Sequence, residues 1–373
     1  MIIKNLVFSS GALQGYAFVG AYKYIYEKDL CKKVENILGV SAGSVISLLY
    51  SLGYKPSELE KISLSVKPSY FLNIKGDNFL NFFNNYGLDD GKSFEKVLKV
   101  IINKKTNNPN ITMLELYKLT NINLILGATN INKQCLEYIN HKTFPNLEVY
   151  KAVRMSMSIP ILFTPIKYND DYYLDGAIIS SCPIYYFKNQ KNTLGFSIHY
   201  KEKKKIDINN FSDFFKSLIY SPLINLRDKE LNCENTIIYD MFDIEAFDFN
   251  IGSDKIKEII DKGYLITKNN IDIILKKNKP LKKKIKPKEN KIKKNKLNFN
   301  KQNDIKSILI ETNETNETNK TNETNLKDKV KDKKETYLNK EDNLNKEDNL
   351  NKKDNLNKHD NLNKEDNLNK DNS

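Results

Sequence analysis

The sequence predicts an α/β fold with a mainly parallel central sheet, carried by residues 1–275 of its 373 residues. In this part, short apolar runs rich in β-branched residues alternate with stretches whose apolar residues recur at helical spacing, as in folds of this class. Beyond Leu275 the chain is mainly Lys, Asn, Asp and Glu, and it lacks the apolar surface that folding requires. The first part is long enough for one large α/β domain.

The predicted elements follow one another in strand–helix order. Residues 2–8 form a β-branched apolar run typical of a buried strand, and a small-residue loop, 9–15, leads to a helix from Ala17 to Ile25. Residues 36–38 end a second strand, and 44–52 form an amphipathic helix. Further strands are predicted at 123–128, 172–174 and 193–200, and a last helix is marked by Ile256, Ile259, Ile260 and Tyr264.

The net charge of +13 at pH 7 is unevenly distributed. Residues 276–301 contain thirteen lysines and one glutamate, whereas residues 302–373 contain fourteen lysines and seventeen acidic residues. We interpret 276–301 as a basic linker and 302–373 as a disordered low-complexity tail. From Leu338 onward the tail repeats one leucine every six residues, a period that fits neither a helix nor a packed solenoid.

The basic linker leaves three roles open: attraction to anionic lipid, nuclear import or nucleic-acid contact, and a solvated spacer. No aromatic residue interleaves the lysines of residues 280–288, and the linker lies outside the folded part. We therefore do not expect nucleic-acid binding to be the main function. A peripheral contact with a membrane surface stays among the expected partners.

The spacing of the cysteines indicates whether the chain binds a metal. The four cysteines, Cys31, Cys135, Cys182 and Cys233, form no C-x-x-C pair and have no metal-ligand spacing. We therefore expect reduced thiols, with no metal and no cofactor.

Residues 1–4 lack the start of a secretory signal, and the uncharged stretch 5–22 is too rich in polar and small residues for a membrane span. These features favour an intracellular protein, cytoplasmic or peripherally membrane-bound.

The motif Gly39-Val40-Ser41-Ala42-Gly43 carries the most chemical information. Between a strand and a helix, a G-x-S-x-G sequence forms a strained turn that exposes the serine hydroxyl as a nucleophile. Its glycines are needed because a side chain would clash where the strand and helix backbones nearly touch. The helix start also places N–H groups and positive partial charge beside the serine. Ser41 is therefore the predicted nucleophile.

A serine nucleophile needs a proton acceptor, and the chain has three histidines. His359 lies in the repeats of the tail, which leaves His141 and His199. His199 follows Ser41 and Asp175 in the Ser…Asp…His order of α/β-hydrolases. However, it lies in a strand-like alternation, where a structural histidine is more usual.

Carboxylates are the other candidates for the base. Asp175 ends an apolar strand and precedes Gly176, which lets the chain turn close to a neighbouring element. Residues 169–171, Asn-Asp-Asp, instead have the composition of a hairpin turn. Asp175 is therefore the preferred base.

Together these residues resemble the patatin-like phospholipase family over about residues 3–275. That family pairs an elbow serine with an aspartate in a D-G-[GA] motif and uses no histidine, and Ser41 and Asp175-Gly176-Ala177 match those positions. Residues 152–165, AVRMSMSIPILFTP, are similar to the family's A-x-R-A-S-x-S-I-P-x-x-F-x-P stretch, and 87–91 look like a family segment that precedes a helix. The resemblance implies a patatin-like three-layer fold and a Ser41–Asp175 dyad.

The family's glycine-rich loop, G-G-G-x-[RK]-G, corresponds here to Ser-Gly-Ala-Leu-Gln-Gly at residues 10–15. Gly11 and Gly15 are retained, whereas small residues replace two glycines and Gln14 replaces the basic residue. The resemblance implies that the N–H groups of Gly11, Ala12 and Ala42 form the oxyanion hole. Loss of one such donor typically costs about 2.7–4 kcal/mol, so a tilted loop would slow the reaction about a hundredfold.

The resemblance implies a serine lipid acyl hydrolase that cleaves fatty-acyl esters of phospholipids or lysophospholipids by two-step acyl transfer, without a metal. Two aromatic clusters, within residues 71–83 and 211–219, could line an acyl pocket, contact a bilayer or simply pack in the core. Two other functions stay open. One is a Ser-His-Asp esterase that uses His199, and the other is a lipid- or partner-binding protein with little turnover.

Overall fold

The computed structural model describes residues 2–73, 82–199, 207–210, 213–214, 217–218, 235–241 and 244–277. The tail and nearly all of the basic linker lie outside these residues. The predicted domain boundaries and the disorder of the tail therefore stay predictions.

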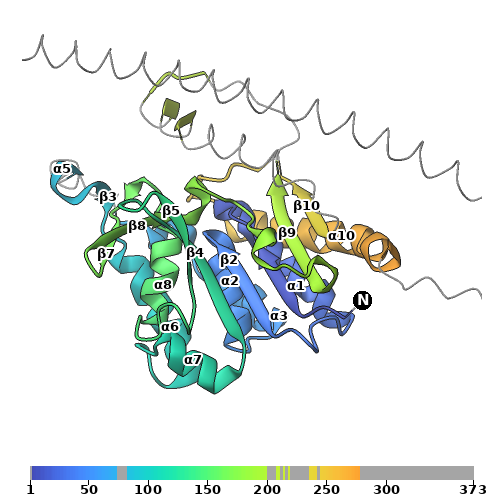
Figure 1. The fold of residues 1–373 in the computed structure, drawn as a ribbon. Coiled ribbons are helices and arrows are strands. Elements are labelled where there is room, and N and C mark those ends of the chain that lie inside the picture. The colour runs from blue at the N-terminus through green and yellow to red at the C-terminus, as the bar shows by residue number, and fades with distance from the viewer. Residues whose placement is uncertain are drawn as a thin grey trace, which may run out of the picture. The chain divides into compact units, whose positions relative to one another are not determined.

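The centre of the fold is a sheet whose main strands run parallel in the order β10-β9-β1-β2-β4 (Figure 1). Three more strands, β5, β7 and β8, pair antiparallel around β4. This eight-stranded, mainly parallel sheet confirms the predicted fold class. Its strands are β1 (Asn5–Phe8), β2 (Asn36–Val40), β4 (Asn123–Asn130), β5 (Cys135–Ile139), β7 (Ile166–Tyr168), β8 (Asp171–Asp175), β9 (Thr193–His199) and β10 (Thr236–Asp240). A separate parallel pair joins β3 (Gly87–Asp89) to β6 (Ile161–Phe163).

The longer helices share one large core with one face of the sheet. They are α1 (Ala17–Glu27), α2 (Ala42–Ser51), α3 (Pro56–Ser65), α6 (Lys92–Thr106), α7 (Met113–Thr120), α8 (Val149–Ser156) and α10 (Ser253–Lys277). Leu6 and Phe8 of β1 point into this core, whereas Val7 and Leu38 point to the opposite face. This alternation is the one expected of strands that are buried on both sides.

A thinner layer covers the opposite face in the described part of the chain. It includes the short 3₁₀ turns η3 (Gly176–Ile178) and η4 (Ile184–Tyr186), whose Ala177 and Ile184 pack on Val7 and Leu38. The remaining short elements are η1 (Ala12–Tyr16), η2 (Pro68–Phe71), α5 (Phe82–Asn85) and η5 (Gln190–Asn192). The predicted hairpin turn at 169–171 joins β7 to β8, and Asn169 and Asp170 adopt positive φ angles of 47° and 67°.

Helix α10, predicted from its isoleucine spacing, lies against α1 (Figure 1). A glycine on each helix permits this close approach. A Cβ at Gly20 would lie 1.9 Å from the carbonyl oxygen of Ile260, and a Cβ at Gly263 would lie 2.1 Å from that of Ala17. Helix α10 is therefore packed, backbone to backbone, against α1.

A ladder of amide side chains joins the parallel strands where they begin. Asn123 donates to Asn36, Asn36 donates to Asn5, and Asn5 donates to the hydroxyl of Thr193, at 2.9–3.0 Å. These residues are paired across β4, β2, β1 and β9. Because each amide both accepts and donates, the ladder fixes the register of these strands at the end where they begin, opposite to Ser41.

Candidate active site

Ser41 occupies the turn between β2 and α2 with φ 54° and ψ −123°. A residue with a side chain in such a sparsely populated region stores about 1–3 kcal/mol of strain, which the surrounding structure must hold. A Cβ at Gly39 would lie 2.2 Å from the carbonyl oxygen of Gly43, and a Cβ at Gly43 would lie 2.2 Å from that of Phe8. The turn thus leaves no room for a side chain at either glycine.

Two serine hydroxyls hold the backbone of Ser41. The N–H of Ser41 donates to Oγ of Ser156 at 3.0 Å, and Oγ of Ser44 donates to the carbonyl oxygen of Ser41 at 2.5 Å. The Ser156 hydroxyl in turn donates to the carbonyl oxygen of Gly127 at 2.7 Å. The turn is therefore tied both to α8 and to β4.

Strand register brings Asp175 beside this turn. Along one edge of β4, Val40 of β2 pairs with Gly127, and Asp175 of β8 pairs with the next residue, Ala128. The Ser41 side chain lies close enough to the Asp175 carboxylate to lower its pKa, and both residues are only 4% exposed. β2 and β8 thus lie end to end along β4, and their ends carry the serine and the aspartate.

The Asp175 carboxylate lies in a desolvated position. The N–H of Ala177 donates to its Oδ1 at 2.9 Å. Burial raises the pKa of Asp175 from 3.8 to about 6, against the opposing effect of the Ser41 side chain and of the N–H of Ala177. At neutral pH the carboxylate is therefore mainly ionised, yet more basic than an exposed aspartate.

The altered glycine loop lies at the same site. Ala12, Gly15 and Ala42 line one cavity together with Ser41, and Ala12 has a positive φ of 46°. Gly11 is not among the lining residues, and a Cβ there would lie 2.3 Å from Cδ1 of Ile198. In the described residues, no group accepts a hydrogen bond from the N–H of Gly11, Ala12 or Ala42. Among the described residues, these three N–H groups are therefore left without a protein acceptor.

Hydrogen bonds to the segment between β10 and α10 hold the loop of residues 10–15 in place. Gln14 is fully buried, and its Nε2 donates to the carbonyl oxygens of Met241 at 3.1 Å and Ile244 at 2.5 Å. The N–H of Leu13 donates to the carbonyl oxygen of Ala246 at 3.1 Å. The glutamine thus holds the loop against the segment between β10 and α10. That role depends on carbonyls some 230 residues away in the chain, so no local sequence pattern predicts it.

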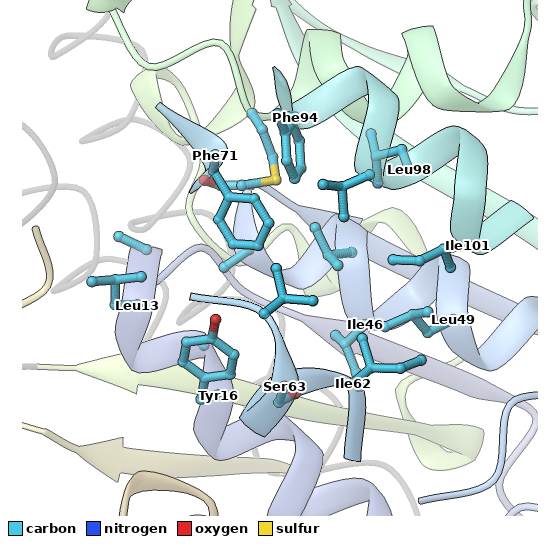
Figure 2. Close-up of a pocket in the computed structure, with 18 of the residues that line it drawn as sticks. Leu13, Tyr16, Ile46, Leu49, Ile62, Ser63, Phe71, Phe94, Leu98 and Ile101 are labelled. Atoms are coloured by element: carbon cyan, nitrogen blue, oxygen red, sulfur yellow. The ribbon is translucent and has the colours of Figure 1, made fainter. Parts of the chain in front are cut away.

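The cavity beside Ser41 has a volume of about 140 Å³ and a predominantly apolar lining. Figure 2 shows side chains from η1, α2, α3, η2 and α6 around this space, among them Leu13, Tyr16, Leu49, Ile62, Phe71 and Leu98. Burial raises the pKa of Tyr16 to about 12, so its hydroxyl stays neutral. Such a lining suits a hydrocarbon chain rather than a polar ligand.

Comparison with known proteins bears on the family of the chain. The sequence profile described as Patatin-like phospholipase matches residues 6–188. The uncharacterised protein R571 of Acanthamoeba polyphaga mimivirus is 32% identical over 231 residues, which cover 58% of this chain and 74% of that protein. The chain belongs to the patatin-like phospholipase family.

A second relative is named Probable lipid hydrolase 463L, from Invertebrate iridescent virus 6. It is 34% identical over 204 residues, which cover 54% of this chain and 66% of that protein. Among solved structures, VipD from Legionella pneumophila aligns with a TM-score of 0.48 and 16% identity, over 73% of this chain and 67% of that one. Family membership places the chain among the lipid acyl hydrolases.

The histidines of this patatin-like protein lie in other surroundings than Ser41. His141 stacks on Tyr117 at 3.7 Å and contacts Asn123, the first residue of β4, at the opposite end of the sheet from Ser41. His199 is the buried last residue of β9. One strand, β1, lies between β9 and β2, the strand that ends at Ser41. The carboxylate whose pKa the Ser41 side chain lowers is that of Asp175.

The other residues that the sequence analysis named lie in different surroundings. Phe71 of the first aromatic cluster lines the cavity, whereas 79–80 lie outside the described residues. In the second cluster Phe214 and Leu218 are exposed, and the others lie outside the described residues. Cys31, Cys135 and Cys182 form no disulfide with one another, and Cys233 is not described. Among described residues, no helix is long and apolar enough to cross a membrane, and His, Cys, Asp and Glu form no metal-binding group.

Proposed function

We propose that this protein hydrolyses fatty-acyl esters of phospholipids or lysophospholipids through a Ser41–Asp175 dyad and an acyl-enzyme intermediate. The observation that carries the proposal is the position of Ser41. Its strained turn opens onto an apolar cavity, and its side chain lies close enough to the buried Asp175 carboxylate to lower its pKa. A nucleophile, a base and a space for hydrocarbon thus meet at one point.

In the first step, the Ser41 oxygen attacks the ester carbonyl carbon while its proton passes to the Asp175 carboxylate. The negative charge on the former carbonyl oxygen is stabilised by the N–H groups of Gly11, Ala12 and Ala42. As the tetrahedral intermediate collapses, the bond to the alcohol oxygen breaks and that oxygen takes the proton from Asp175. The fatty acyl group stays on Ser41.

In the second step, water attacks the acyl-enzyme. Asp175 accepts a proton from the water, and the Ser41 oxygen leaves and recovers that proton, which releases the fatty acid. The aspartate thus serves as base and then as acid in each half of the reaction. The acyl chain occupies the apolar cavity during both steps.

Two further proposals concern the rest of the chain. We assign catalysis to residues 1–275, and we propose that the lysines of 276–301 attract the protein to anionic lipid at about 1 kcal/mol per basic residue. Removing 276–373 would then weaken binding to anionic vesicles while leaving hydrolysis of a soluble ester unchanged.

Fatty-acid release tests the function. The full-length protein is incubated with vesicles of phosphatidylcholine and phosphatidylserine, beside Ser41→Ala. We expect the wild type to release fatty acid and the variant to fall to the uncatalysed level, because the nucleophile is lost. Equal release by both proteins, or none by the wild type, would contradict the proposal and favour a binding role for the fold.

The pKa of Asp175 predicts how the rate depends on pH. The carboxylate accepts a proton only when it is ionised, so kcat/KM should fall as the pH drops through the pKa of about 6. Below that point we expect about a tenfold loss per pH unit, and above it a plateau. A soluble ester assayed between about pH 4 and 9 measures this profile. An inflection near 4, the value of an exposed aspartate, would show that burial does not tune the base.

A further inference from the structure

A three-residue segment at the end of α8 contacts both members of the proposed dyad. Oγ of Ser156 accepts the N–H of Ser41 at 3.0 Å. Two residues later, the carbonyl oxygen of Ser158 accepts the N–H of Asp175 at 2.9 Å. Residues 156–158 therefore connect the backbone of the serine to the backbone of the aspartate.

The Ser156 hydroxyl also connects the serine turn to the strand that carries the pairing partner of Asp175. It donates to the carbonyl oxygen of Gly127 at 2.7 Å, and the next residue, Ala128, pairs with Asp175. The path from the N–H of Ser41 through Ser156 to Gly127 thus ends beside Ala128, the pairing partner of Asp175. A displacement of the turn along β4 would break this path.

The three groups on this path are buried. Ser156 is fully buried and Ser41 is 4% exposed, and Gly127 lies within the buried strand β4. An alanine at position 156 would leave a backbone N–H and a backbone C=O without this partner, and water would not readily replace it. The strained φ and ψ of Ser41 would then lose one of the contacts that hold them.

Arg154 holds the same segment from its other side. Its guanidinium is fully buried, donates to Oγ of Ser158 at 2.7 Å and to the carbonyl oxygen of Thr164 at 3.2 Å, and lies 4.5 Å from the ring centroid of Phe163. The segment that carries Ser156 is therefore fixed independently of the serine turn. A residue that orients a nucleophile must itself be held in place by its neighbours.

We propose that Ser156 is a positioning residue of this site: its hydroxyl fixes the Ser41 turn against β4 and so keeps the Ser41 oxygen within reach of the Asp175 carboxylate. The inference rests on the proposed function, because alignment matters only if these two residues react together. Ser156 does not line the apolar cavity. Its removal should therefore change the chemical step and not the binding of the acyl chain.

Steady-state kinetics of full-length Ser156→Ala on p-nitrophenyl octanoate test this proposal. A misplacement of about 1 Å costs about a hundredfold in rate, so we expect kcat to fall about a hundredfold while KM stays within about twofold. Ser51→Ala is the matched control. Ser51 is a buried serine at the end of α2, the helix that follows the Ser41 turn. Its hydroxyl donates to the carbonyl oxygen of Ser47, away from the site. It should keep the wild-type kcat.

Each outcome decides the proposal. A wild-type kcat in folded Ser156→Ala would overturn it, and so would an equal loss in Ser51→Ala, because any buried hydroxyl would then have the same effect. If Ser156→Ala does not fold, Ser156→Cys decides, since a thiol keeps the shape but bonds weakly. We expect about a tenfold lower kcat there, and an unchanged kcat would overturn the proposal. Ser41→Ala is assayed alongside: if it stays as active as the wild type, the proposed function itself fails.

Discussion

Replacing Asp175 with asparagine is expected to lower kcat/KM for ester hydrolysis by about 10³-fold, within the range that general-base catalysis contributes. The amide matches the carboxylate in shape and can still accept the N–H of Ala177, which now donates at 2.9 Å. It cannot take the proton of Ser41. The assay is hydrolysis of a soluble ester at a pH of about 8, where the wild-type carboxylate is ionised.

The same substitution should stabilise the fold at high pH. The pKa of Asp175 is raised from 3.8 to about 6 in the folded protein, so the wild type loses about 3 kcal/mol of stability as the pH rises from below 4 to above 6. An asparagine has no such loss. The midpoint of thermal unfolding of Asp175→Asn, relative to the wild type, should therefore be higher at about pH 8 than at about pH 5.

His199→Ala is the matched control for this prediction. A Ser-Asp dyad keeps its rate in this variant, whereas a Ser-His-Asp triad loses most of it. Full activity in Asp175→Asn together with inactivity in His199→Ala would replace the proposed base with the histidine.

Gly43→Ala is expected to disrupt both the fold and the site. The new Cβ would lie 2.2 Å from the carbonyl oxygen of Phe8 and 2.5 Å from that of Ser9, both backbone atoms at the end of β1. Either α2 or β1 must move, and we expect a loss of about 3 kcal/mol in the free energy of unfolding. Because α2 starts directly after Ser41, ester hydrolysis should fall together with stability.

Urea unfolding measures the change, with Gly252→Ala as the control. A Cβ at Gly252 meets no atom within 4 Å, so that variant should unfold at the wild-type midpoint. If Gly43→Ala also keeps the wild-type midpoint and activity, the close contact between α2 and the end of β1 is not a constraint on this site.

Local patterns were sufficient to predict the central strands and the serine turn. The β-branched run before Phe8 and the apolar residues before Gly39 are strands in the sheet. A strand that is buried on both faces appears in the sequence as a short continuous apolar run. The turn at Ser41 follows from the spacing of two glycines. The resemblance to the family also pointed to Asp175, although its position beside the Ser41 turn depends on an antiparallel pairing with β4 that no local pattern encodes.

Residues that act through distant contacts were not predictable. Ser156 was part of a recognisable stretch, but its partners Ser41 and Gly127 lie 115 and 29 residues away. No local pattern explains the glutamine at position 14 either, because its side chain donates to carbonyl oxygens at 241 and 244. The cavity draws its lining from helices α2, α3 and α6, whose apolar faces are indistinguishable from ordinary core faces in the sequence.

The decisive measurement is the site of covalent labelling by a fluorophosphonate, which reacts with activated serine hydroxyls. The full-length protein is labelled, digested, and the modified peptide identified by mass. We predict one label on the peptide that contains Ser41 and none in Asp175→Asn under the same conditions. A label on another serine, or no label on a protein that releases fatty acid, would contradict a mechanism in which Ser41 is the nucleophile.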